Sequence, residues 1–258
     1  MRNLKIALLL ISVSSTGLFA IGGLGFYGGQ GMFTVASTTD ENTIATITTG
    51  EFSNPMQVGV YLYINAIPFI DIEVDAQATW SEYTFDFNNA LGTAGPYDSY
   101  WGGASTYITL RKNLFGLGIP LLGGAKIHAG AGYNMHSFGP LANLKLVEDI
   151  MGDLSAEPEF DEDKLVKFVK DNKVDINGYH VQAGLQFKLL MLDSFLIYRL
   201  TFGEFEDVFD AKSFGSLNLR LGFGIYTKLN VDKKRGRFLP LFLFQQQQLL
   251  CLVFFSVF

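Results

Sequence analysis

The chain has 258 residues with a formal net charge of −6, and 48% of its residues are hydrophobic whereas only 17% are charged. The negative charge argues against a nucleic-acid partner, which needs a basic surface to meet the phosphates. A single cysteine, Cys251, excludes disulfide and cysteine-metal frameworks. No stretch of the central region is a continuous apolar span of about 18 residues, so a chain this apolar is either a soluble core or a membrane barrel.

The N-terminus has the order of a secretory signal peptide. Arg2 and Lys5 precede the apolar run Ile6–Ile11, and small residues follow up to Gly17. We expect cleavage between Gly17 and Ala20, so residues 1–20 are predicted to be a signal peptide that exports the chain. An uncleaved membrane anchor is the alternative, but the apolar run is short for a span of roughly 20 residues.

A strand pattern recurs about eight times between Gly22 and Lys228. In the clearest copy, Leu217–Ile225, apolar residues alternate with Asn218, Arg220 and glycines. Period-two alternation is typical of a strand with two unlike surroundings, because successive side chains point to opposite faces. The predicted strands are Gly22–Val35, Gln57–Asn65, Ile70–Phe87, Ser99–Lys112, Leu121–Met135, Gly178–Leu190, Phe195–Phe202 and Ser216–Lys228.

The connections between these strands alternate in length. Ala66–Phe69, Asn113–Gly118 and Met191–Ser194 are short, whereas the intervening connections are mostly longer. Short turns at one rim and long loops at the other are typical of outer-membrane barrels, with the short turns facing the periplasm. The sequence therefore predicts an all-β, antiparallel, up-and-down transmembrane β-barrel of about eight strands over residues 21–229.

The polar faces of these strands mix charges of both signs with small residues, whereas a solvated surface would carry mostly long charged side chains. We therefore expect the polar faces to line the lumen and the apolar faces to meet lipid. Opposite charges would form a network across a narrow barrel, because unpaired burial of a charge is costly. The predicted lumen polar network is Asp71, Glu73, Asp75, Arg111, Lys126, His128, His180, Lys188, Arg199 and Arg220.

Several aromatic residues fall near the predicted strand ends. Membrane barrels carry aromatic girdles at both interfaces, where amphipathic rings sit at the level of the lipid headgroups. The residues predicted to form such girdles are Tyr27, Trp80, Tyr83, Tyr100, Trp101, Tyr133 and Tyr179.

The third long loop contains a helical pattern. Within Leu141–Asp171, apolar residues recur at helical spacing around Phe168, so we expect one or two short amphipathic helices that cap the barrel mouth or rest on it. The acidic run Glu157–Asp163 lacks the spacing of a Ca²⁺ loop and is interpreted as a solvated loop face.

Residues 230–258 do not continue the alternating pattern, and Gln245–Gln248 interrupt their apolar run. Three interpretations stay open for this tail. A membrane helix is possible by length, and the terminal Phe258 resembles the assembly signal of a last barrel strand. We favour the third, an aberrant extension of the chain.

No catalytic, cofactor or metal site is predicted. His128 and His180 share the polar face with the acidic residues and are candidates for acid–base chemistry, because histidine titrates near neutral pH. However, no nucleophile is marked by spacing, and no ligand spacing supports a metal. Hydrogen bonding inside the lumen is the preferred role of both histidines.

With its signal peptide, its alternating strands and its alternating loop lengths, Gly22–Lys228 resembles the small eight-stranded outer-membrane barrel superfamily of Gram-negative bacteria. The resemblance implies a protein embedded in outer-membrane lipid, with an interior just wide enough for side chains or one small ligand. We expect a monomeric, noncatalytic barrel with a structural or surface-interaction role through its long loops. The alternatives are a narrow channel or transporter for a small or apolar solute, and a secreted soluble barrel that binds a ligand.

Overall fold

The computed structural model describes residues 20–65, 69–90, 92–119, 123–151, 162–189 and 192–226. The predicted signal peptide as far as residue 19, the acidic run from 157 to 161 and the predicted tail 230–258 lie outside these ranges. Gly22–Gly224 form one compact unit. The second unit, which consists of the two ends of the chain, contributes only residues 20–21 and 225–226 to the described part.

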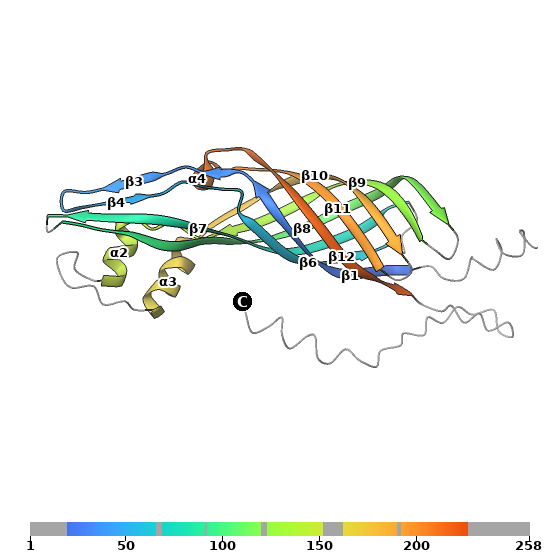
Figure 1. The fold of residues 1–258 in the computed structure, drawn as a ribbon, viewed down its shortest axis with the longest axis horizontal. Helices are drawn as coiled ribbons and strands as arrows, with labels where there is room; N and C mark the ends of the chain where they lie inside the picture. Colours follow the sequence, from blue (N-terminus) through green and yellow to red (C-terminus); the bar gives the residue numbers. More distant parts are fainter. Residues whose placement is uncertain are drawn as a thin grey trace, which may run out of the picture. The chain divides into compact units, whose positions relative to one another are not determined.

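Eight of the described strands close into a ring (Figure 1), in the order β7, β6, β1, β12, β11, β10, β9 and β8, with β8 pairing back to β7. Seven of these pairings have an antiparallel register, so β12 also runs opposite to β1. The predicted all-β antiparallel barrel of about eight strands is confirmed. The strands are β1 (Ala20–Met32), β6 (Met56–Ile64), β7 (Asp71–Asn89), β8 (Gly92–Ile119), β9 (Gly123–Phe138), β10 (Val174–Leu189), β11 (Leu192–Gly203) and β12 (Ser213–Tyr226).

Inward-facing glycines make room for the large rings of neighbouring strands. A Cβ added to Gly59 would lie 2.4 Å from the ring of Tyr27, and one added to Gly222 would lie 2.3 Å from the hydroxyl oxygen of Tyr61. An eight-stranded barrel has little internal space, so a small residue on one strand allows a ring on the next to lie across it.

Two strands are longer than predicted. The predicted turn Asn113–Gly118 is wrong, because β8 continues to Ile119, paired with β9 across an irregularity between Asn113 and Phe115. At the opposite end, β7 and β8 stay paired as far as Asn89 and Gly92. The expected connection at Asn88–Asp98 is therefore largely strand.

The first long connection, predicted as a loop, contains four short strands. These are β2 (Thr34–Val35), β3 (Thr38–Glu41), β4 (Ala45–Thr49) and β5 (Phe52–Ser53). β4 pairs with β3 and with the end of β7. Consequently β3, β4, residues 82–89 of β7 and residues 92–100 of β8 form a four-stranded sheet that continues past the ring (Figure 1); we call it the extension.

The described helices lie in two of the connections. α2 (Leu144–Met151) and α3 (Glu162–Asn172) occupy the third long connection, where helices were expected, and α4 (Glu206–Phe209) lies between β11 and β12. The side chain of Leu144 packs on Ala45 and Ile47 of β4, and its backbone N–H donates a hydrogen bond of 2.9 Å to Oδ2 of Asp40. α2 therefore covers one face of the extension. No helix in the described part of the chain is both long and apolar enough to cross a membrane.

Candidate functional site

A row of three carboxylates on β7 points into the ring. Asp71, Glu73 and Asp75 alternate along the strand, which places them on one face, and the side chains of Glu73 and Asp75 are fully buried. Three buried arginines face them from other strands: Arg111 on neighbouring β8, Arg199 on β11 and Arg220 on β12. In the ring, β11 and β12 are not neighbours of β7, so these last two contacts cross the interior.

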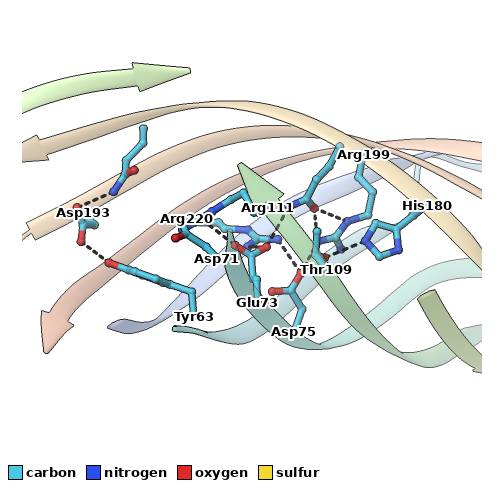
Figure 2. Close-up of polar contacts among 12 residues, drawn as sticks. Tyr63, Asp71, Glu73, Asp75, Thr109, Arg111, His180, Asp193, Arg199 and Arg220 are labelled. Carbon is cyan, nitrogen blue, oxygen red and sulfur yellow. Dashed lines mark hydrogen bonds and ion pairs between the residues drawn. The ribbon is translucent and has the colours of Figure 1, made fainter. Parts of the chain in front are cut away.

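The six side chains form a continuous ion-pair chain (Figure 2). Arg111 donates from Nη2 to Oδ2 of Asp71 at 3.3 Å and from Nη1 to Oε2 of Glu73 at 2.9 Å. Arg220 donates from Nη1 to Oε1 of Glu73 at 2.8 Å and from Nη2 to Oδ2 of Asp75 at 2.7 Å. Arg199 completes the chain by donating to the same oxygen of Asp75. Three positive and three negative groups make it formally neutral.

Neutral and aromatic groups complete the surroundings of the arginines. Gln182 on β10 accepts a hydrogen bond from Nε of Arg199 and donates one to Oε1 of Glu73, each 3.0 Å long. Each guanidinium also lies over a ring: Cζ of Arg199 is 3.8 Å from the ring centroid of Tyr107, and the others are 4.9 Å from their nearest tyrosine ring. Cation–π attraction is strongest where both groups are desolvated, as they are here.

The other predicted network residues lie apart from this chain. Lys126 is exposed near the short-turn end of β9. Nζ of Lys188, whose side chain is 29% exposed, lies 3.9 Å from Oδ2 of Asp193. The structure therefore brings six of the ten predicted residues into one ion-pair chain and leaves both lysines outside it.

Within the described ranges, neither histidine of the predicted network has a carboxylate partner. Nε2 of His180 is 2.8 Å from Oγ1 of Thr109 (Figure 2). Neither ring nitrogen of His128 has a hydrogen-bond partner within the described part of the chain. Among the described residues no hydrogen bond or ion pair links either ring to a carboxylate, so the arrangement offers no acid–base pair.

Sequence reasoning missed a second polar cluster around Asp193. Its carboxylate accepts a hydrogen bond of 2.7 Å from the Tyr63 hydroxyl and one of 3.0 Å from Nε2 of Gln186. The predicted strand began at Phe195, which left Asp193 in a turn, whereas β11 begins at Leu192. Asp193 has the same parity as Arg199, so a predicted strand beginning three residues earlier, at Leu192, would have placed the Asp193 side chain in the interior.

Aromatic side chains fill the loop end of the ring. Trp101 stacks on Phe138 with a centroid distance of 5.3 Å, and Phe209 stacks on Phe33 at 4.4 Å. Phe205 lies 5.0 Å from Phe209. These side chains belong to one buried cluster, which we call the aromatic cap: Phe33, Val35, Phe52, Tyr83, Trp101, Phe138, Ala142, Ile176, Phe205, Phe209 and Phe214.

Part of the predicted aromatic girdle is wrong. Tyr27, Tyr83 and Trp101 are buried inside, because their positions have the parity of the inward-facing residues. Only Trp80, Tyr100, Tyr133 and Tyr179 have exposed side chains. Proximity to a strand end did not distinguish the two groups, whereas the alternation along each strand does.

The outside of the ring is apolar. Large hydrophobic side chains stay exposed on every strand of the ring, in alternation with the buried polar ones. A continuous exposed apolar surface of this kind marks an interaction with an apolar phase or partner. It includes Leu24, Phe26, Val58, Val60, Leu62, Val74, Ile108, Leu110, Ile127, Val181, Leu185, Phe187, Leu196, Leu217, Leu219 and Phe223.

The fold and the interior define a class of protein: a closed eight-stranded antiparallel barrel with a charged inside and an apolar outside. No family model matches the chain, and no curated protein does. Among solved structures it resembles small outer-membrane barrels, although the individual family is not identified.

Three such structures illustrate this resemblance. The N-terminal β-barrel domain of OprF from Pseudomonas aeruginosa is 10% identical, with a TM-score of 0.39 over 78% of this chain and 98% of that one. The attachment invasion locus protein Ail of Yersinia pestis is 11% identical, with a TM-score of 0.32 over 80% and 97%. The outer membrane protein OprG from Pseudomonas aeruginosa is 10% identical, with a TM-score of 0.35 over 80% and 93%. With identities of 10–11% and TM-scores below 0.5, these likenesses say nothing about the role of this chain.

Proposed function

We propose that this chain is an integral outer-membrane β-barrel protein, noncatalytic, with a structural or surface-interaction role through its long loops. One observation carries the proposal: large apolar side chains are exposed all around a ring whose arginine–carboxylate ion pairs are buried inside. Lipid solvates such a surface, whereas water does not. The predicted signal peptide supplies the route of export.

The same observation disfavours the soluble ligand-binding alternative. A soluble barrel that carries an apolar ligand needs apolar side chains inside and polar ones outside. Here the inside holds the ion-pair chain between Asp71 and Arg199, and the outside holds Leu217, Leu219 and their neighbours.

The filled interior also favours a structural or interaction role over transport. The ion-pair chain crosses the lumen, and the aromatic cap lies at the loop end of the same ring. Eight-stranded barrels are just wide enough for side chains to fill them. The extension and the helices of the third long connection remain as surface available to a partner.

The first test is fractionation of cells expressing the full chain, with gel migration of heated and unheated samples compared. We expect recovery in outer membranes and heat-modifiable migration, because a folded barrel resists detergent until it is heated. Recovery as a soluble protein without detergent would overturn the proposal.

The second test determines which end of the barrel faces outward. In a Cys251→Ser background, Thr93→Cys places a thiol at the tip of the extension, and Lys126→Cys places one near the short turns. A membrane-impermeant maleimide applied to intact cells should label only the Thr93→Cys protein. Labelling of the Lys126→Cys protein alone would reverse the proposed orientation.

A further inference from the structure

The extension has two unlike faces. The register places Glu82 opposite Tyr100 and Thr84 opposite Asp98, and it places Asp86 opposite Thr48. Because side chains alternate along each strand, these residues share one face with the even-numbered positions of β4 and the odd-numbered positions of β3. We call this the outer face: Thr39, Glu41, Thr46, Thr48, Glu82, Thr84, Asp86, Asn88, Asp98 and Tyr100.

Part of the opposite face of the extension is covered by the chain itself. Ala45 and Ile47 are buried against Leu144 of α2, with Phe85 and Phe87 packed against the same cluster. By contrast, Glu41, Glu82 and Asp98 on the outer face are exposed. One side of this sheet is therefore a packing surface within the fold, and the other side faces away from it.

The outer face carries charge of one sign only. Between Ile6 and Leu110 the sequence contains no lysine, arginine or histidine, so no basic group lies within the four strands of the extension. Four carboxylates stand on the outer face, and the side chains between them are threonine, asparagine and tyrosine. An exposed surface of one sign attracts a partner of the opposite sign and accelerates its encounter.

The spacing of these carboxylates points to an extended partner. Same-face neighbours on a strand lie about 7 Å apart, and adjacent strands lie about 4.8 Å apart, so the charges are spread over the sheet instead of meeting at one point. Within the described part of the chain no group of three potential ligands is placed to hold a metal ion. Tyr100, which is 69% exposed beside Glu82, adds a ring on which a cationic side chain can rest.

We propose that the outer face docks a basic, lysine- or arginine-rich segment of another protein in an extended conformation. Its cationic side chains pair with Glu41, Glu82, Asp86 and Asp98, and the threonine hydroxyls accept its remaining hydrogen bonds. This interaction rests on the proposed function, because it requires the extension to project from the cell surface.

The test uses the full chain folded in zwitterionic detergent and a fluorescein-labelled oligolysine peptide, with binding followed by fluorescence anisotropy at low ionic strength. The variant Glu41→Gln/Glu82→Gln/Asp98→Asn removes three charges from the outer face. The control Glu204→Gln/Glu206→Gln/Asp207→Asn removes three charges from exposed residues of the connection between β11 and β12. We expect the first variant to weaken binding about tenfold and the control to change it less than about twofold.

Equal weakening in both variants would overturn the inference, since the peptide would then respond only to net charge. Absence of binding to the unmodified chain would overturn it as well. Displacement of the peptide by CaCl₂ far beyond the effect of NaCl at equal ionic strength would assign the face to a divalent cation instead.

Heat-modifiable migration of every variant separates this inference from the proposed function. A folded barrel that fails to discriminate the two variants contradicts only the docking site, whereas loss of the folded barrel in the unmodified chain contradicts the proposed function. If the triple variant does not fold, the single substitutions Glu82→Gln and Asp98→Asn replace it, each with an expected loss of about twofold.

Discussion

At the scale of single residues, the interior is organised by shared partners. Glu73 accepts from both Arg111 and Arg220, and Asp75 accepts from both Arg220 and Arg199. Among the described residues, only Arg220 pairs with both Glu73 and Asp75. Removing it leaves one uncompensated negative charge in a site buried from bulk solvent, where charges interact strongly.

The substitution Arg220→Met should therefore lower the free energy of unfolding by about 3–5 kcal/mol, the cost of breaking a buried ion pair on one side. Urea unfolding of the protein in lipid vesicles, followed by tryptophan fluorescence, measures this loss. Methionine preserves most of the side-chain length, so the measurement reports the lost charge more than a cavity.

Two further variants accompany the unfolding measurement of Arg220→Met: one tests a second ion pair, and the other is a surface control. The double variant Arg199→Met/Asp75→Asn removes one charge of each sign and should lose less stability than the sum of its single substitutions. Lys126→Met, at an exposed position, should change the free energy of unfolding by less than about 0.5 kcal/mol. Strict additivity in the double variant would show that Arg199 and Asp75 do not stabilise each other.

At the scale of strands and helices, the sequence predicted strands most accurately where the two faces of a strand have unlike surroundings. β10 and β12 alternate cleanly, because one face is buried and polar and the other is exposed and apolar. That contrast was enough to place Arg111, Arg199 and Arg220 on the buried side. It did not reveal which carboxylate each arginine meets, since the partners come from strands distant in sequence.

The alternating pattern did not predict strands where the contrast between a buried polar face and an exposed apolar face ends. Beyond the ring, β3 is polar and exposed on both sides, and β4 has only two apolar residues, Ala45 and Ile47, on its buried face, so both strands resembled a loop. Lys126 shows the same limit: its parity is that of the interior, but its position near the rim leaves it exposed. Parity specifies a face, whereas depth in the barrel depends on register with the neighbouring strands.

The extension should depend on α2 more than the ring does. Leu144→Ala removes the side chain packed on Ala45 and Ile47, and such a buried truncation costs about 2–5 kcal/mol. We expect faster hydrogen exchange in β3 and β4, measured by mass spectrometry, with unchanged exchange in β10 and β11. Exposed Glu148 provides the matched control, since Glu148→Ala should leave both regions unchanged. Equal loosening of β10 and β11 would mean that the extension and the ring unfold as one unit.

At the scale of the whole barrel, the ion-pair chain and the aromatic cap fill different levels of the interior. The ion-pair chain joins β7, β8, β11 and β12, and the aromatic cap gathers side chains at the loop end of the ring. Phe205 and Phe209 reach the cap from the connection that contains α4. The ion-pair chain and the aromatic cap consist of different residues, so substitutions can remove one of them and leave the other in place.

Conductance across planar bilayers tests this closure and the channel alternative together. We expect no stepwise conductance from the unmodified protein, because charged side chains paired across the lumen leave no open path for ions. Phe205→Ala/Phe209→Ala should also be silent, since it thins the cap and leaves the ion-pair chain between Asp71 and Arg199 intact. A general diffusion porin reconstituted in the same way controls for insertion. Steps in the unmodified protein would favour the narrow channel, whereas steps only in the double variant would show that the aromatic cap is what closes the barrel.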